Sequence, residues 1–301
     1  MTNDEVFSRI EEEFMLRNYS KRTMASYKRT AVEFLHFAGK SNFEELDQDD
    51  LRRYLVHLRS NNIVAPSTSN QYNAACKFIL KVILRKPVDE YNCPNAKIHR
   101  KIQPAMTRDQ IRLMLSNFND ISSFTFFMLL YGTGLRFSEA LDVKAEDIKP
   151  GDHGTHYIHV VHGKRDKERY VFLPDACYRA LRRYWAFNKR GGDASDLVFP
   201  LKIHKTSAKY FLQKSFNDVR YGNTILEEFT PHSLRRSFAT HLFQVDRGNI
   251  WTIKDSLGHA NLGTTELYLG NVNTYQKFTE TPADVCEDAY AAFLARNGWR
   301  R

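Results

Sequence analysis

One segment divides the chain into two parts that carry different sequence patterns. Residues 94–106, PNAKIHRKIQPAM, contain two prolines and four basic residues, counting His99, but no acidic residue. Proline without an apolar repeat is typical of a linker, and 301 residues are enough for two domains. We therefore predict a helical domain at 1–97, a basic linker at 98–106 and a second domain at 107–301.

The first domain shows apolar residues at helical intervals of three and four. Ser20 and Gly39 are suited to begin and end one helix, and Asp47 is suited to begin the next. A third helix is expected from Ser67, after Pro66. The basic residues on the remaining faces keep a protein in solution, and together they are also able to follow a DNA backbone: Lys21, Arg22, Lys28, Arg29, Lys77 and Lys81.

The second domain has a mixed pattern. Thr107 and Gln110 form a capping box, and the apolar residues 121–134 predict a helix that ends in a glycine turn. Residues 156–161 and 168–173 flank GKRDK and predict a β-hairpin. Further helices are expected at about 175–189, 207–218, 232–244, 250–257, near 264 and at 282–296. The predicted fold is mainly α with a small β-hairpin or sheet, an all-helical N-terminal domain followed by an α+β domain.

Charge and composition narrow the class of protein. The net charge is +9, divided as +4 over residues 1–106 (17 basic, 13 acidic) and +5 over the remainder (27 basic, 22 acidic). A basic excess in both halves suits a protein that grips nucleic acid with both. No apolar segment is long enough to span a membrane, and the acidic N-terminus does not fit a signal peptide. The four cysteines have no CxxC spacing, which favours unpaired thiols in the cytoplasm.

Several common catalytic and metal-binding patterns do not fit. His153, His156, His159 and His162 lie three residues apart, but the surrounding residues predict a turn and a strand, where such positions face opposite sides. A metal site is therefore not expected. The chain also lacks a GxSxG nucleophile motif and a Walker-type phosphate loop.

The residue types needed to cleave a phosphodiester without metal do occur in the second domain. Extra negative charge on the transition state is best held by arginine, while a hydroxyl nucleophile requires a base and the departing oxygen an acid. Candidates follow one another along the chain: Arg136, Lys164, His232, Arg235, His259 and Tyr268.

Each candidate also has an ordinary structural explanation when it is taken alone. Arg136 would pair with Glu139 on a helix surface, Tyr268 would pack in an apolar stripe, and His232 would cap a helix after Pro231. The joint pattern, rather than any one residue, favours a phosphate site.

Four motifs, GTGLR-x-SEAL, GK-x-x-KER-x-V-x-LP, H-x-LR-x-SFATHL and LGH-x-x-x-x-TT-x-x-Y, occur in this order. Together they resemble the tyrosine recombinase (phage integrase) family from about residue 107 to 270. The helical first domain is similar to the core-binding domain of that family. The lack of room for a further domain before the first helix suits a minimal, Xer-like or mobile-element recombinase.

The resemblance implies a role for each matching residue. Arg136 and Arg235 would clamp the scissile phosphate, and His259 would hydrogen-bond it. Lys164 would protonate the leaving 5′ oxygen, and Tyr268 would attack to form a 3′-phosphotyrosyl bond. The proton of the nucleophile would be handled by His232. No metal, cofactor or ATP would be required.

Other assignments stay open at this stage. Lys167 and Arg169 have an alternative claim on the acid role. Arg236 and the pair Leu269–Gly270 depart from residues common in relatives, a His and a Thr-His pair. A type IB topoisomerase-like relaxer and a non-catalytic DNA-binding protein of the same fold are the competing functions.

The resemblance also implies partners. Four copies would assemble on double-stranded recombination sites, with a partner recombinase or accessory factor as a further possibility and no membrane. The apolar stripe of 282–296 is expected to lack a partner in its own chain and to pack on a neighbouring copy.

Overall fold

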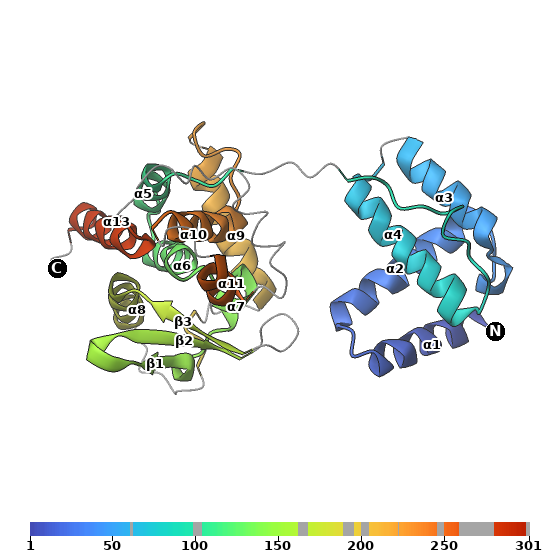
Figure 1. The fold of residues 1–301 in the computed structure, drawn as a ribbon, viewed down its shortest axis with the longest axis horizontal. Helices are drawn as coiled ribbons and strands as arrows, with labels where there is room; N and C mark the ends of the chain where they lie inside the picture. Colours follow the sequence, from blue (N-terminus) through green and yellow to red (C-terminus); the bar gives the residue numbers. More distant parts are fainter. Residues whose placement is uncertain are drawn as a thin grey trace. The chain divides into compact units, whose positions relative to one another are not determined.

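The chain forms two compact units, Met1–Lys101 and Ile102–Arg301. The computed structural model describes residues 1–60, 63–98, 104–161, 168–188, 196–199, 205–221, 223–245, 250–258 and 280–298. Figure 1 draws the N-terminal unit in blue to cyan and the C-terminal unit mainly in green to red. Each unit has its own hydrophobic core, as a domain requires.

The regular elements described in the N-terminal unit are all helices, as predicted. The helix α2 begins after Ser20, whose hydroxyl accepts the Thr23 N–H, and ends at Gly39 with φ of 66°. Asp47 accepts the Asp50 N–H at the start of α3. The elements are α1 (Asn3–Leu16), α2 (Lys21–Ala38), the short η1 (Phe43–Glu45), α3 (Gln48–Ser60), α4 (Pro66–Phe78) and its π-helical continuation η2 (Ile79–Ile83).

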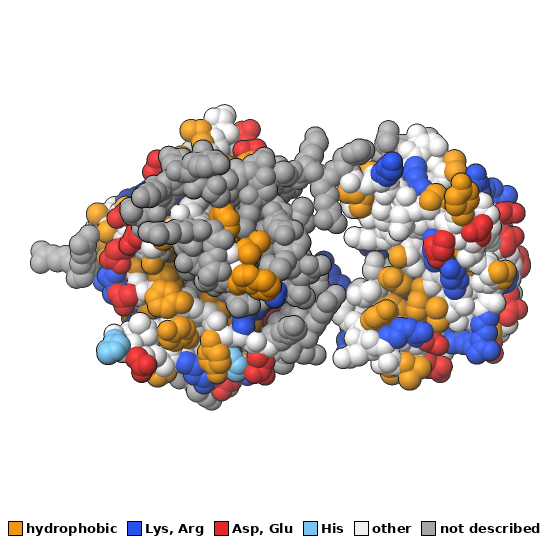
Figure 2. Space-filling model, viewed as in Figure 1, with side chains coloured by type: hydrophobic (Ala, Val, Ile, Leu, Met, Phe, Trp, Pro, Cys, Tyr) orange, Lys and Arg blue, Asp and Glu red, His pale blue; other side chains and the backbone are white. Residues whose placement is uncertain are grey.

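Four of the six basic residues considered for DNA contact have acidic partners. Lys28 pairs with Glu11, and Arg29 lies 3.7 Å from Glu33. Glu90 receives both Lys77 and Lys81. On the face drawn in Figure 2, basic and acidic side chains of this unit are interspersed. Such surface pairs contribute little stability, about 0–1 kcal/mol each, but they reduce the positive charge that reaches a phosphate.

The C-terminal unit surrounds one buried helix with other helices and a small sheet. Its helices are α5 (Arg108–Ser116), α6 (Ile121–Thr133), α7 (Phe137–Asp142), η3 (Ala145–Asp147), η4 (Asp152–Gly154), α8 (Asp175–Phe187), α9 (Lys205–Tyr221), α10 (Pro231–Val245), α11 (Ile250–Leu257) and α13 (Pro282–Arg296). The predicted helix near 264 lies outside the described residues. The Thr107–Gln110 capping box is present.

The sheet confirms the predicted hairpin and adds a strand. Its antiparallel order is β1 (Ile148–Pro150), β2 (His156–Val160) and β3 (Arg169–Leu173), with Ile158 opposite both Ile148 and Val171. Three residues in β1 are too few to show a period of two, which explains why the sequence pattern did not reveal this strand.

The helix α6 forms the centre of the C-terminal unit. Phe124, Phe127 and Tyr131 have no exposed surface, and α5, α8, α10 and α13 all pack on this helix. Figure 1 shows α6 enclosed by these neighbours. A helix that is apolar on every face must be covered on every face, so its sequence requires this central position.

The helix α13 packs on its own chain. Phe293 stacks on Phe124 of α6 with ring centroids 4.0 Å apart, and Arg296 donates to Asn119 at 2.6 Å. The apolar stripe is buried against α5, α6 and α8, through Val285, Cys286, Ala289, Tyr290, Phe293 and Leu294. The expectation that this stripe lacks a partner within its own chain was therefore wrong. Periodicity shows that a helix face is buried, but not which chain buries it.

No described helix combines the length and apolar character needed to cross a lipid bilayer.

Candidate active site

Arg136 stands at the junction of a glycine turn and the helix α7. Gly134 ends α6 with φ of 64°, and a Cβ there would lie 2.4 Å from the Phe238 ring of α10. Glycine is therefore required both by the backbone and by close packing. The helix α7 (Phe137–Asp142) begins directly after Arg136, which occupies its N-cap position.

Glu139 is the partner of Arg136, but it is buried rather than on a helix surface. The Glu139 carboxylate accepts a hydrogen bond from the Arg136 backbone N–H at 2.9 Å and another from the Arg136 guanidinium at 2.5 Å. Arg169 of β3 donates to the same carboxylate at 2.7 Å. Burial alone would raise the pKa of Glu139, but hydrogen bonds from Arg169 and from the Arg136 backbone outweigh it and hold this pKa at about 2. Glu139 is thus ionised at neutral pH.

Arg235 enters the same cluster from α10. Its side chain is 2% exposed and lies 3.9 Å from the Glu139 carboxylate. One guanidinium nitrogen donates to the Gly134 carbonyl at 2.5 Å, and the other donates to the Leu257 carbonyl at 2.6 Å. These carbonyls end α6 and α11, so Arg235 ties three helices together and has a fixed position. Two arginines from separate motifs therefore meet at one carboxylate.

His232 lies one turn before Arg235 on α10. Its pKa is lowered to about 4, first by the protein atoms that crowd the ring and then by repulsion from Arg235, Arg236 and Arg136. The residue nevertheless stays exposed to solvent. A neutral imidazole at neutral pH is able to accept a proton from a nucleophile.

Comparison with known proteins decides the family. Residues 104–274 match the model of the phage integrase family, which is more than half of the chain. The chain belongs to the phage integrase family. Residues 6–90 of this integrase-family chain match the phage integrase N-terminal SAM-like domain.

The relatives of this integrase-family chain carry recombinase names. The integrase/recombinase y4qK of Sinorhizobium fredii is 30% identical over 87% of this chain and 82% of its own length. A tyrosine recombinase of Thermosipho africanus is 29% identical, over 87% and 93%. The tyrosine recombinase XerD of Rickettsia prowazekii is 28% identical, over 84% and 88%.

Solved structures agree in fold. The XerH site-specific recombinase bound to palindromic difH substrate, in a post-cleavage complex, superposes with a TM-score of 0.67 and 21% identity, over 86% of this chain and 79% of that one. A lambda integrase dimer bound to a COC' core site gives a TM-score of 0.66 at 14% identity, over 93% and 80%. The predicted fold class, an all-helical domain followed by an α+β catalytic domain, is confirmed.

Three of the six predicted site residues lie outside the described part of this integrase-family chain: Lys164, His259 and Tyr268. Gly258, which directly precedes His259, is described. A Cβ there would lie 2.9 Å from Cδ of Arg169, the first residue of β3. Glu139 and Arg169 are the site neighbours whose arrangement the motifs did not predict.

The described histidines of the hairpin do not converge on a metal. The His156 ring stacks on Tyr178 at 3.6 Å, whereas His159 stacks on Tyr170 and lies 3.2 Å from Glu168. The described residues hold no cluster of three or more His, Cys, Asp and Glu suited to a metal ion. His162 is outside the described residues.

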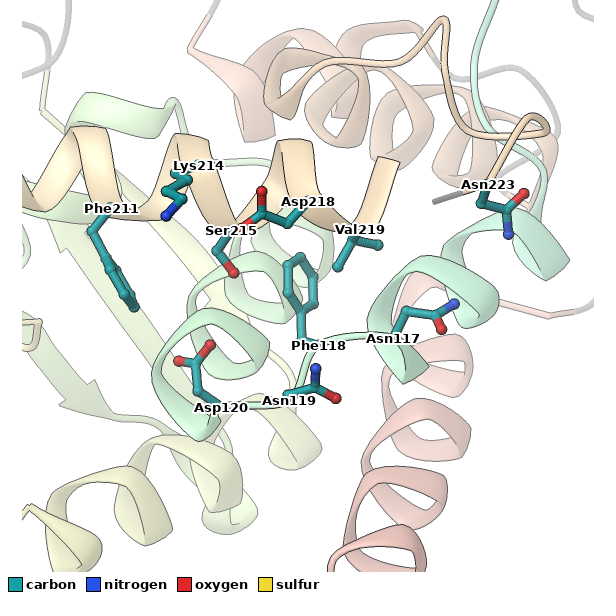
Figure 3. Close-up of a pocket in the computed structure, with 10 residues that line it drawn as sticks. All are labelled: Asn117, Phe118, Asn119, Asp120, Phe211, Lys214, Ser215, Asp218, Val219 and Asn223. Atoms are coloured by element: carbon teal, nitrogen blue, oxygen red, sulfur yellow. The ribbon is translucent and has the colours of Figure 1, made fainter. Parts of the chain in front are cut away.

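A groove elsewhere on the C-terminal unit does not contain the arginine cluster. It has a volume of 440 Å³ and lies between α9 and the segment that joins α5 to α6. Figure 3 shows Lys214, Ser215 and Asp218 on the α9 side, facing Phe118 and Asp120. Because the arginine cluster lies elsewhere, the volume of this groove does not identify it as the active site.

Acid is expected to destabilise the C-terminal unit through His241. This buried ring lies 2.8 Å from the Tyr131 hydroxyl, and burial first, then repulsion from Arg108, lowers its pKa to about 3. In the unfolded state this histidine has a pKa near 6.5, so below pH 6.5 the unfolded state binds more protons than the folded state. As the pH is lowered from 6.5 toward 3, the free energy of unfolding therefore decreases by about 1.4 kcal/mol per pH unit. His232 shifts in the same direction.

Urea unfolding at pH 7.5 and 5.5 measures this loss. A His241→Gln variant should show a weaker dependence on pH than the wild type, whereas the exposed His153→Gln should match the wild type. Equal dependence in all three chains would reject the assignment.

Proposed function

We propose that the protein is a site-specific DNA recombinase whose Tyr268 cuts and rejoins DNA strands. Family membership gives the reaction class, a tyrosine recombinase. The observation that supports this site most directly is the meeting of Arg136 and Arg235 at Glu139. Two guanidinium groups that meet at one buried carboxylate suit a phosphate whose negative charge grows in the transition state.

In the proposed reaction, the Tyr268 oxygen attacks the scissile phosphorus and the bond to the 5′ oxygen breaks. His232 assists the loss of the tyrosine proton, and Lys164 donates a proton to the leaving 5′ oxygen. Arg136 and Arg235 hold the phosphate oxygens together with His259. The 3′-phosphotyrosyl bond retains the energy of the phosphodiester, so a 5′ hydroxyl from another strand reverses the step without ATP, metal or cofactor.

We assign residues 1–97 to core-DNA binding, 98–106 to the linker and 107–301 to catalysis. A groove of 420 Å³ between α2 and α4 supports a DNA-binding role for the first unit. Arg22 supplies charge at this groove, Arg29 lines it beside its partner Glu33, and Ser26, Thr68 and Gln71 supply hydrogen-bonding groups. These are the side-chain types that bind phosphates and base edges. The last linker residue, Met106, is buried in the C-terminal unit and donates to Ser237 of α10 at 2.8 Å.

A homotetramer on two double-stranded sites follows from the chemistry, because two duplexes present four strands and each chain supplies one Tyr268. We further propose that α13 is exchanged in trans between these copies. A swapped helix would make the contacts to α5, α6 and α8 in a neighbour that it makes here in its own chain.

The proposed biological role is integration or excision of a mobile element, or resolution of chromosome dimers through Holliday junctions. A partner recombinase or accessory factor fits either role. The protein would act in the cytoplasm, on the nucleoid where its DNA lies.

A nicked suicide substrate tests the proposal. Duplexes carrying candidate recombination sites would be incubated with wild type, Tyr268→Phe and a control, Tyr210→Phe, whose side chain is exposed on α9. A slow-migrating covalent adduct on a denaturing gel is expected from the wild type and the control alone. Binding without an adduct from the wild type would favour a non-catalytic protein. Adducts on any duplex, with relaxation of supercoiled DNA, would favour a topoisomerase.

A further inference from the structure

Arg169 has an unusual position for a charged residue. It is the first residue of β3, on the same face as the buried Val171 and Leu173, and its side chain is only 10% exposed. A buried guanidinium requires partners that compensate for lost water. The partners of Arg169 therefore indicate what this residue does.

The first contact is with Glu139. Two nitrogens of Arg169 donate to the two carboxylate oxygens, at 2.7 and 3.3 Å, in the paired geometry that arginine makes best. The same carboxylate holds Arg136 and lies 3.9 Å from Arg235. Three guanidinium groups and one carboxylate leave this cluster a net charge of +2. Without Arg169 the net charge would be +1, and the carboxylate would interact with the two phosphate-binding arginines alone.

The second contact is with the end of α11. A Cβ on Gly258 would lie 2.9 Å from Cδ, 3.1 Å from Nε and 3.1 Å from Nη1 of Arg169, and Gly258 has φ of 63°. The Arg169 side chain thus lies directly against the backbone that precedes His259. Any side chain at Gly258 would displace it.

We propose that Arg169 is a positioning residue for strand cleavage, which holds Glu139 away from the phosphate and fixes the backbone before His259. This inference rests on the proposed function. It also differs from the acid role considered for Arg169, because a guanidinium held by Glu139 against Gly258 is not placed to serve as a proton donor.

The test compares Arg169→Met, Arg169→Lys, Glu139→Gln and the Glu139→Gln/Arg169→Met double variant. Single-turnover adduct formation is measured on the nicked substrate, and the DNA dissociation constant is measured by anisotropy. Arg169→Met should slow the adduct step by about 10- to 100-fold, as expected for misplaced reacting groups, with DNA affinity within about threefold. Arg169→Lys, which keeps the charge, should recover part of the rate.

The double variant separates positioning from general structural damage. If the unbalanced carboxylate causes the loss, the double variant should be no slower than Arg169→Met. Gly258→Ala, which disturbs Arg169 from the other side, should reproduce the loss. Phe172→Thr, on the exposed face of the same strand, should cleave like the wild type. A wild-type rate in Arg169→Met, or losses that multiply in the double variant, would overturn the proposal.

A measurement that does not depend on cleavage separates the positioning role of Arg169 from the proposed recombinase function. Titration of the Glu139 carboxyl by ¹³C NMR should show a higher pKa in Arg169→Met than in the wild type. If the wild-type chain forms no adduct, the proposed function fails, while this titration still decides whether Arg169 controls Glu139. An unchanged Glu139 pKa would reject the coupling.

Discussion

Replacing Arg235 with alanine is expected to abolish detectable adduct formation and to destabilise the C-terminal unit. The variant loses a guanidinium that we propose binds the phosphate, and removal of one such donor costs about 10²- to 10³-fold in rate. It also leaves the buried Gly134 and Leu257 carbonyls without their donor, at about 1–3 kcal/mol each. Adduct formation on the nicked substrate and urea unfolding measure the two effects separately.

Arg136→Ala is the matched control for these two effects. The Arg136 side chain is 25% exposed, and unlike Arg235 it is not the donor to the carbonyls that end α6 and α11. We therefore expect a comparable loss of cleavage with a smaller loss of stability. Arg235→Lys should keep the charge but not both carbonyl contacts, because an ammonium is not a planar fork. Normal cleavage by folded Arg235→Ala would remove this residue from the proposed site.

Replacing Phe293 with alanine is expected to destabilise the isolated chain by about 3–5 kcal/mol, the range for large buried aromatic residues. Phe293 is 2% exposed and stacks on Phe124, so its removal leaves a cavity between α13 and α6. Hydrogen exchange of peptides from α5, α6 and α8 measures the effect within the full chain.

The exposed Ala295 on the same helix provides the control. Ala295→Ser should change stability by less than about 0.5 kcal/mol. If Phe293→Ala left exchange in the DNA-free chain unchanged but weakened assembly on DNA, α13 would pack only on a neighbouring copy. Increased exchange in the DNA-free chain would support the packing seen in the structure.

The local placement of three of the candidate residues, Arg136, His232 and Arg235, could be predicted because it depends on short segments. HSLR places His232 and Arg235 one turn apart on any helix, and the glycine turn before Arg136 follows from its residues. The pairing of Arg136 with Glu139 was also foreseeable from their spacing. Its burial was not, because Arg169 and Arg235 reach Glu139 from other elements.

The fold shows the same division. Ser20, Gly39 and the Thr107–Gln110 capping box define helix ends through hydrogen bonds within a few residues, and the structure confirms them. The strand β1 was missed because its pairing with β2 decides its conformation. The four cysteines also show which features were predictable from the sequence and which were not. All are buried and unpaired, yet Cys177 and Cys286, distant in sequence, both contact the Met128 carbonyl.

The sequence by itself determined the two-part organisation, most of the helices, the hairpin and the order of the catalytic motifs, because these depend on neighbours along the chain. Tertiary structure alone decided that Glu139 lies buried among three arginines, that Arg169 rests against Gly258 and that α13 covers its own chain. The physical reason is that an amphipathic pattern or a charged residue specifies the need for a partner. Which partner meets that need depends on side chains brought together from distant parts of the chain.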